Sequence, residues 1–168
     1  MRRVTRSVLG GAIGLLVAWT AHATPVGRAA VPPTGETIVR ASTSKTSVEV
    51  LIKTRARPAP APSDPKSNVI ELPRLSEIER IDIRVNGKPI DVHAGAYLLL
   101  TDVHHAEVTV GPKLMVLTLE GGETATSYTV RYEFDSTRLK RRIVASALFG
   151  PGKGVLEDSR YYVPVLGP

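Results

Sequence analysis

The sequence predicts a mainly β protein, arranged as an antiparallel β-sandwich or an open barrel. Three observations support this fold class. Short runs alternate apolar and polar residues, turn residues such as glycine and proline separate these runs, and helical periodicity is scarce. Many short strands with turns between them are typical of sandwiches and barrels. One short helix is expected near residues 94–102, where the alternation is poor and helix-forming residues are common.

The clearest strand signal is a hairpin centred on Asn86-Gly87, between two alternating runs. An Asn-Gly pair favours a type I′ turn, because both central residues of that turn need a positive φ. The two-residue loop also fixes the register and places Ile83 opposite Ile90 on an apolar face. Pro89 has no N–H group to donate, so its strand is expected at the edge of a sheet.

Residues 1–23 have the pattern of a secretory signal peptide. Three arginines stand among the first six residues, a short apolar run follows, and Ala21-His22-Ala23 is an A-x-A cleavage site. The apolar run is too short for an ordinary membrane span, and no stop-transfer segment follows it. We therefore expect a periplasmic or secreted protein of a bacterium, with no stable membrane span after cleavage.

Composition narrows the class of protein further. Cleavage after Ala23 would leave 145 of the 168 residues, which suits one domain. The chain has no cysteine, so the exported domain must be held together by its core without disulfides. Loss of the three signal-peptide arginines lowers the formal net charge from +6 to +3. Such a mild charge gives little support to nucleic-acid binding, and export argues against it.

The domain organisation follows from turn-rich and proline-rich stretches. Residues 24–35 are small and rich in proline and glycine, which indicates a flexible leader. A single β-rich domain is expected over 36–168, with early strands near 37–39 and 47–53. A proline-rich linker or loop interrupts it at 57–66, where alternating alanine and proline favour an extended spacer.

Strand signals resume after the expected helix and continue to the C-terminus. Each run either alternates or is apolar nearly throughout, and each is bounded by turn residues. The expected strands lie at 107–110, 114–119, 128–134, 139–149 and 161–166. The last of these contains Pro164, which again favours an edge position.

One cluster has residue types that could bind a metal ion. Asp102 and His104 would share a face of an extended segment, His105 would point away, and His93 could approach from the preceding helix. Carboxylate and neutral imidazole suit Zn²⁺, but such a site needs three or four converging ligands. His93, Asp102 and His104 are therefore the candidate metal ligands, and solvated histidines at a strand end are the alternative.

The main charge feature is the run Arg138-Leu-Lys-Arg-Arg142. On a regular strand Arg138, Lys140 and Arg142 would project to one side and form a cationic stripe, which Arg131 on the preceding strand could widen. Such a stripe could bind an anionic partner. The alternative is a solvated face that discourages edge-to-edge aggregation.

No motif for nucleophilic catalysis or phosphate binding is present in the sequence. No serine lies in a G-x-S-x-G elbow, and the glycine-rich segment 150–154 lacks the frame of a P-loop. We therefore expect an exported, non-enzymatic β-domain that needs no cofactor and binds a protein or an anionic component of the cell envelope. The alternatives are an inhibitor or immunity-like protein for an envelope enzyme, and a metal-binding or hydrolytic protein that uses Asp102, His104 and His105.

Overall fold

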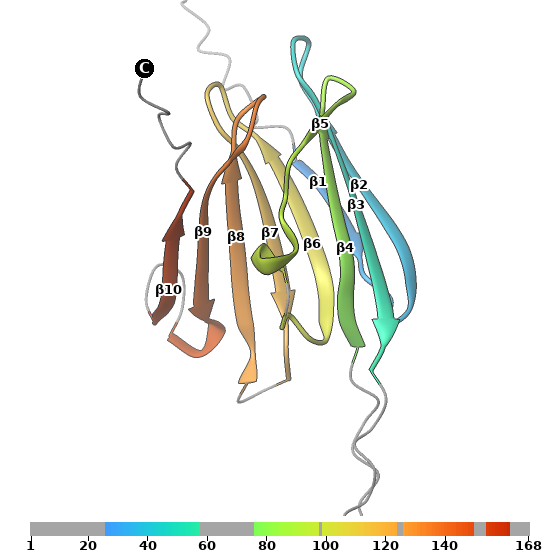
Figure 1. The fold of residues 1–168 in the computed structure, drawn as a ribbon, viewed down its shortest axis with the longest axis vertical. Helices are drawn as coiled ribbons and strands as arrows, with labels where there is room; N and C mark the ends of the chain where they lie inside the picture. The colour runs from blue at the N-terminus through green and yellow to red at the C-terminus, as the bar shows by residue number, and fades with distance from the viewer. Residues whose placement is uncertain (1–25, 58–75, 98, 124–125, 150–153, 162–168) are drawn as a thin grey trace, which may run out of the picture.

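A computed structural model describes residues 26–57, 76–97, 99–123, 126–149 and 154–161, and its fold is a sandwich of two antiparallel sheets (Figure 1). The strands are β1 Val26–Ala30, β2 Gly35–Ser42, β3 Ser47–Ala56, β4 Ser76–Val85, β5 Lys88–Ile90, β6 Val103–Val110, β7 Met115–Gly121, β8 Tyr128–Phe134, β9 Leu139–Ser146 and β10 Val155–Arg160. The described elements also include the 3₁₀ turns η1 Ala94–Ala96 and η3 Ala147–Phe149. The predicted fold class is confirmed, as a sandwich rather than an open barrel.

The two sheets differ in width. One has six strands in the order β1-β6-β7-β8-β9-β10, and the other has four in the order β2-β3-β4-β5. The chain crosses from the first sheet to the second after β1 and returns after β5. Residues 91–102, which include η1, form the returning segment, called the crossover below.

The core lies between the inner faces of the sheets and follows the alternation of the sequence. Val48, Val50 and Ile52 of β3 share one buried face, as predicted. Leu117 and Leu119 of β7 are fully buried in the opposite sheet. Burying such aliphatic side chains contributes roughly 1.5–3 kcal/mol each, which lets a chain without cysteine hold its fold.

The hairpin at Asn86-Gly87 has the predicted turn and register. Asn86 has φ 50° and Gly87 has φ 77°, as a type I′ turn requires. Ile83 faces Ile90, and Pro89 lies on β5, which is an edge strand. Sequence chemistry alone was sufficient here because the turn sets the register locally.

The prediction of a flexible leader at 24–35 is wrong for the described part of that segment. Residues 26–30 form β1, which pairs with β6 from Val26 opposite Thr109 to Ala30 opposite His105. The run has no strong apolar alternation, because it lies at a sheet edge and its residues are small. Gly27 is required for close packing, since a Cβ there would overlap the carbonyl oxygen of Arg40.

The helix expected near 94–102 is reduced to the single turn η1. Leu99 and Asp102 have positive φ, so the crossover is irregular after η1. Of the strand expected at 161–166 only Tyr161 is described, and the edge strand β10 lies earlier, at Val155–Arg160. The predicted signal peptide, and the proline-rich segment apart from residue 57, lie outside the described residues. Within the described chain, no helix is long and apolar enough to cross a membrane.

Candidate functional site

Among the described residues, the unequal width of the sheets leaves part of the six-stranded sheet without a partner sheet. Contacts between the sheets are made mainly through β1 and β6. Strands β8, β9 and β10 extend beyond the four-stranded sheet on one side, and the crossover with η1 passes in front of β7 and β8 (Figure 1). We call the inner face of β8–β10 together with the crossover the open half of the sandwich.

Two tyrosines of β8 attach the crossover to this inner face. The Tyr132 hydroxyl donates to the carbonyl oxygen of Ala96 at 2.7 Å, and the Tyr128 hydroxyl donates to that of Thr101 at 2.6 Å. Burial raises the pKa of Tyr128 to about 12 and raises the pKa of Tyr132 as well. Both hydroxyls therefore stay protonated near neutral pH and remain available as donors.

A cleft of about 640 Å³ lies beside the crossover in the open half. Its volume is within the range of small-molecule sites in proteins. Apolar side chains from the crossover, β9, η3 and β10 make up much of its lining, and these are Leu99, Leu100, Val144, Phe149 and Leu156. Three of them are strongly exposed, with Leu99 93%, Phe149 62% and Leu156 68% accessible to solvent.

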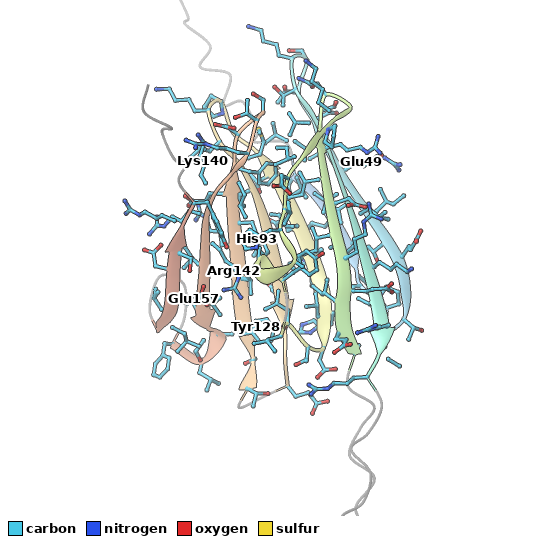
Figure 2. All side chains as sticks on the ribbon, in the orientation of Figure 1. Glu49, His93, Tyr128, Lys140, Arg142 and Glu157 are labelled. Atoms are coloured by element: carbon cyan, nitrogen blue, oxygen red, sulfur yellow. The ribbon has the colours of Figure 1, made fainter. Side chains whose placement is uncertain are left out.

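Arg142 and Glu157 are the charged residues that line the cleft, and Arg142 is the buried one of the two. It is only 8% exposed, and its Nη1 atom lies 2.6 Å from Oε1 of Glu157 on β10 (Figure 2). Burial alone would lower the pKa of Arg142, but the hydrogen bonds with Glu157 and Tyr132 raise it. The hydrogen bond with Arg142 in turn lowers the pKa of Glu157, so both Arg142 and Glu157 are ionised at neutral pH.

The Nε atom of Arg142 is buried and has no hydrogen-bond partner among the described residues. An unpaired buried donor is costly, by about 1–3 kcal/mol, and more for a charged group. Glu157 thus satisfies Arg142 at one nitrogen only. Carboxylates often bind arginine through two parallel hydrogen bonds, so the site retains unused capacity for an anion.

The expected cationic stripe is not formed. The β8–β9 ladder shifts register at Lys140, since Arg141 lies opposite Glu133 while Leu139 lies opposite Phe134. This bulge reverses the alternation, so Arg142 faces inward opposite the buried Tyr132. The regular two-residue alternation expected for residues 138–142 is therefore interrupted at Lys140.

The cations expected in that stripe are instead mostly paired with neighbouring acids. Arg131 lies 3.1 Å from Glu133, and Lys140 lies 2.7 Å from Asp135. The guanidinium of Arg138 makes no ion pair with a described residue. Of the four candidate residues, only Arg142 lies in the cleft.

The three candidate metal ligands are not brought together. Asp102 Oδ1 accepts a hydrogen bond from the backbone N–H of Ser76 at 2.8 Å, which ties the crossover to the start of β4. His93 packs edge-on against Tyr161 with ring centroids 5.2 Å apart, and His104 is exposed. The described chain has no group of three or more His, Cys, Asp or Glu residues that could hold a metal ion.

Sequence reasoning missed most of the cleft, although some signals were present. Tyr128 and Tyr132 share the apolar face of an alternating run, and polar hydroxyls on such a face suggest specific partners. Nothing in the sequence links Glu157 to Arg142, because their pairing depends on the register of β9 and β10. Comparison with protein-family models, curated proteins and solved structures finds no match for this chain. The geometry of the open half is therefore the basis for a functional proposal.

Proposed function

We propose that this chain is an exported, non-enzymatic binding domain, and that it binds another component of the cell envelope through the open half of its sandwich. The observation that carries the proposal is the cleft beside the crossover, with a buried arginine inside and exposed apolar side chains around it. Apolar lining with a few placed polar groups is characteristic of binding sites.

Four of the large exposed apolar residues lie at one end of the β9–β10 hairpin, and two of these, Phe149 and Leu156, line the cleft. Leu148 and Phe149 of η3 are 59% and 62% exposed, and Val155 and Leu156 of β10 are 53% and 68% exposed. Single exposed apolar residues are common, whereas a group of large ones marks an interaction surface. We call these four residues the apolar rim.

The polar groups of the cleft suit binding better than acid–base catalysis. A general acid or base works best when its pKa lies near the operating pH. The pKa of Glu157 is lowered by Arg142, and the pKa of Tyr128 is raised to about 12 by burial. Both shifts move these groups away from neutrality, which supports a role in recognition.

The test is capture of a partner by residues 24–168, the chain without its predicted signal peptide, which we call the mature domain. Variants of the apolar rim are compared with it. The double substitution Phe149→Ser and Leu156→Ser should reduce capture from an envelope fraction at least tenfold, because both exposed contacts are removed. The matched control is Ile38→Ser with Val26→Ser, which removes two exposed apolar side chains of β2 and β1. Captured material is identified by mass spectrometry for both proteins and small molecules.

Equal loss of capture in the rim variant and the control would contradict a site in the open half. A further arm replaces Arg131 and Arg138 by serine, and unchanged capture is expected because neither residue lines the cleft. Loss of capture in that arm alone would instead support the outer cationic surface. The identity of the partner also separates a structural envelope component from an enzyme that this domain inhibits.

A further inference from the structure

The ion pair in the cleft is asymmetric. Arg142 is almost completely buried, with 9% of its side chain exposed, whereas the Glu157 side chain is 46% exposed. Only Nη1 of the arginine meets the carboxylate, and Nε remains without a described partner. Glu157 therefore covers the arginine from the solvent side without using its full donor fork.

Glu157 lies where it can move away without disrupting the core. It is on β10, which is the edge strand of the described sheet and pairs there with β9. The ladder is irregular between Val155 and Glu157, so the backbone is less constrained there. Ser159 donates a hydrogen bond of 2.6 Å to Oε1 of Glu157, and this contact can be kept when the arginine is released.

The surroundings of Arg142 define what could replace Glu157. Besides the ion pair, the polar side chains that line the cleft are Thr126, Ser127, Tyr128 and Ser146. The hydroxyls of Thr126 and Tyr128 already donate to the backbone carbonyls of Glu123 and Thr101. The aliphatic and aromatic part of the walls includes Leu100, Val144 and Phe149. A ligand that satisfies both features needs one anionic head and an apolar body.

We propose that the cleft binds a monocarboxylate with an apolar tail, whose carboxylate replaces Glu157 at the Nη end of the Arg142 guanidinium. Glu157 then acts as an internal occupant that competes with the ligand. This inference rests on the proposed binding function and specifies the ligand class of the same cleft.

The test titrates decanoate into the mature domain and follows the arginine Nε–H resonances by NMR. The Arg142 resonance is assigned by its loss in Arg142→Lys. We expect decanoate to shift this resonance strongly, because the carboxylate bound to the same guanidinium is exchanged. Decanol supplies the tail without the charge and acetate supplies the charge without the tail, so each should bind at least tenfold more weakly than decanoate.

Glu157→Gln removes the competing carboxylate, and we expect it to bind decanoate at least fivefold more tightly than the unsubstituted domain. The matched control is Asp158→Asn, on the same strand and with the same change in charge. Asp158 faces the other side of the sheet and pairs with Arg141 at 2.7 Å, so its replacement should leave decanoate affinity within twofold. Arg142→Lys should weaken binding at least tenfold, and its near-ultraviolet circular dichroism reports whether it folds.

An equal gain in affinity for Glu157→Gln and Asp158→Asn would overturn the proposal, because a general charge effect would explain both. An unshifted Arg142 resonance at saturating decanoate would also overturn it. Neither result would contradict the proposed binding function if the apolar-rim variant showed reduced capture of the envelope partner. The open half would be rejected as a binding site if decanoate failed to shift the Arg142 resonance and the apolar-rim variant also captured its partner as well as the unsubstituted protein.

Discussion

At the scale of single residues, hydrogen-bonded side chains determine how the crossover lies on the sheet. Tyr128 and Tyr132 hold two backbone carbonyl groups of a segment that has almost no regular structure of its own. Buried carbonyls need partners, and an irregular segment cannot supply them internally. The tyrosines thus hold an irregular connection in place as one wall of the cleft.

The raised pKa of Tyr128 makes this attachment sensitive to alkali. Its pKa in the folded state is about 12, against 10.0 ordinarily, so the folded state holds the phenolic proton more tightly. The resulting stabilisation is complete below pH 10 and is lost as pH rises from 10 towards 12. We expect the free energy of unfolding, measured with urea between pH 9 and pH 11, to fall less steeply in Tyr128→Phe. An identical slope in the two proteins would contradict this prediction.

The acidic side of the stability profile depends on Asp135 at the β8–β9 turn. Partial burial would raise its pKa, but Lys140, Thr137 and the N–H of Arg138 together lower it well below its ordinary value. A depressed pKa contributes stability that is present above pH 4 and is lost as pH falls further. The ion pair with Asp135 also explains why the Lys140 side chain lies at the turn and not in the cleft.

At the scale of elements, the sequence predicted what local chemistry determines. The hairpin at Asn86-Gly87 was predictable in turn type and register, because two residues with positive φ suffice to set it. The alternation of apolar and polar residues in β3 and β8 identified their buried faces, because alternation is also a local property of the sequence. Strand β1 was missed because its place depends on β6, about 80 residues away, rather than on a pattern of its own.

The cleft was predictable only in part. Arg142 was singled out as a cation on the later strand, but for a stripe that the bulge at Lys140 prevents. A single extra residue in one strand reverses which side chains face inward, and no turn signal in the sequence indicates it. The partnership with Glu157 depends in addition on the irregular pairing of β10.

Two glycines allow a test of the difference between local and long-range determinants. A Cβ at Gly87 meets no atom, so Gly87→Ala should cost only the backbone strain of positive φ, about 1–2 kcal/mol. A Cβ at Gly27 would overlap Arg40, so Gly27→Ala should displace β1 from its place beside β2. Hydrogen exchange should therefore accelerate at the β1–β6 amides in Gly27→Ala alone. Equal protection of those amides in both variants would contradict this assignment.

At the scale of the whole molecule, the first described strand begins close to the predicted cleavage site. Strand β1 starts at Val26, three residues after Ala23. A protease that cuts after Ala23 would leave Thr24-Pro25 as the only residues before the first strand. The expected cut therefore removes the predicted signal peptide and spares every described strand of the sandwich.

Export can be tested by expression of the full chain in a bacterial host, followed by fractionation and intact-mass measurement. We expect the protein in the periplasm or the medium, with Thr24 as its first residue. Replacement of Ala21 and Ala23 by large residues should block processing, since small residues are needed at an A-x-A site. A cytoplasmic protein that retains Met1 would contradict the proposed localisation.

The edge strands that flank the open half also bear on how copies of this protein behave at high concentration. A bare strand edge can recruit an identical strand from another molecule and start a polymer. Strand β10 carries Glu157, Asp158 and Arg160 in succession along its second half, and β5 is only three residues long and contains Pro89. Charge on one edge and shortness with proline on the other both oppose strand addition. The fold can therefore keep one half of its larger sheet open without that opening becoming a seed for fibres.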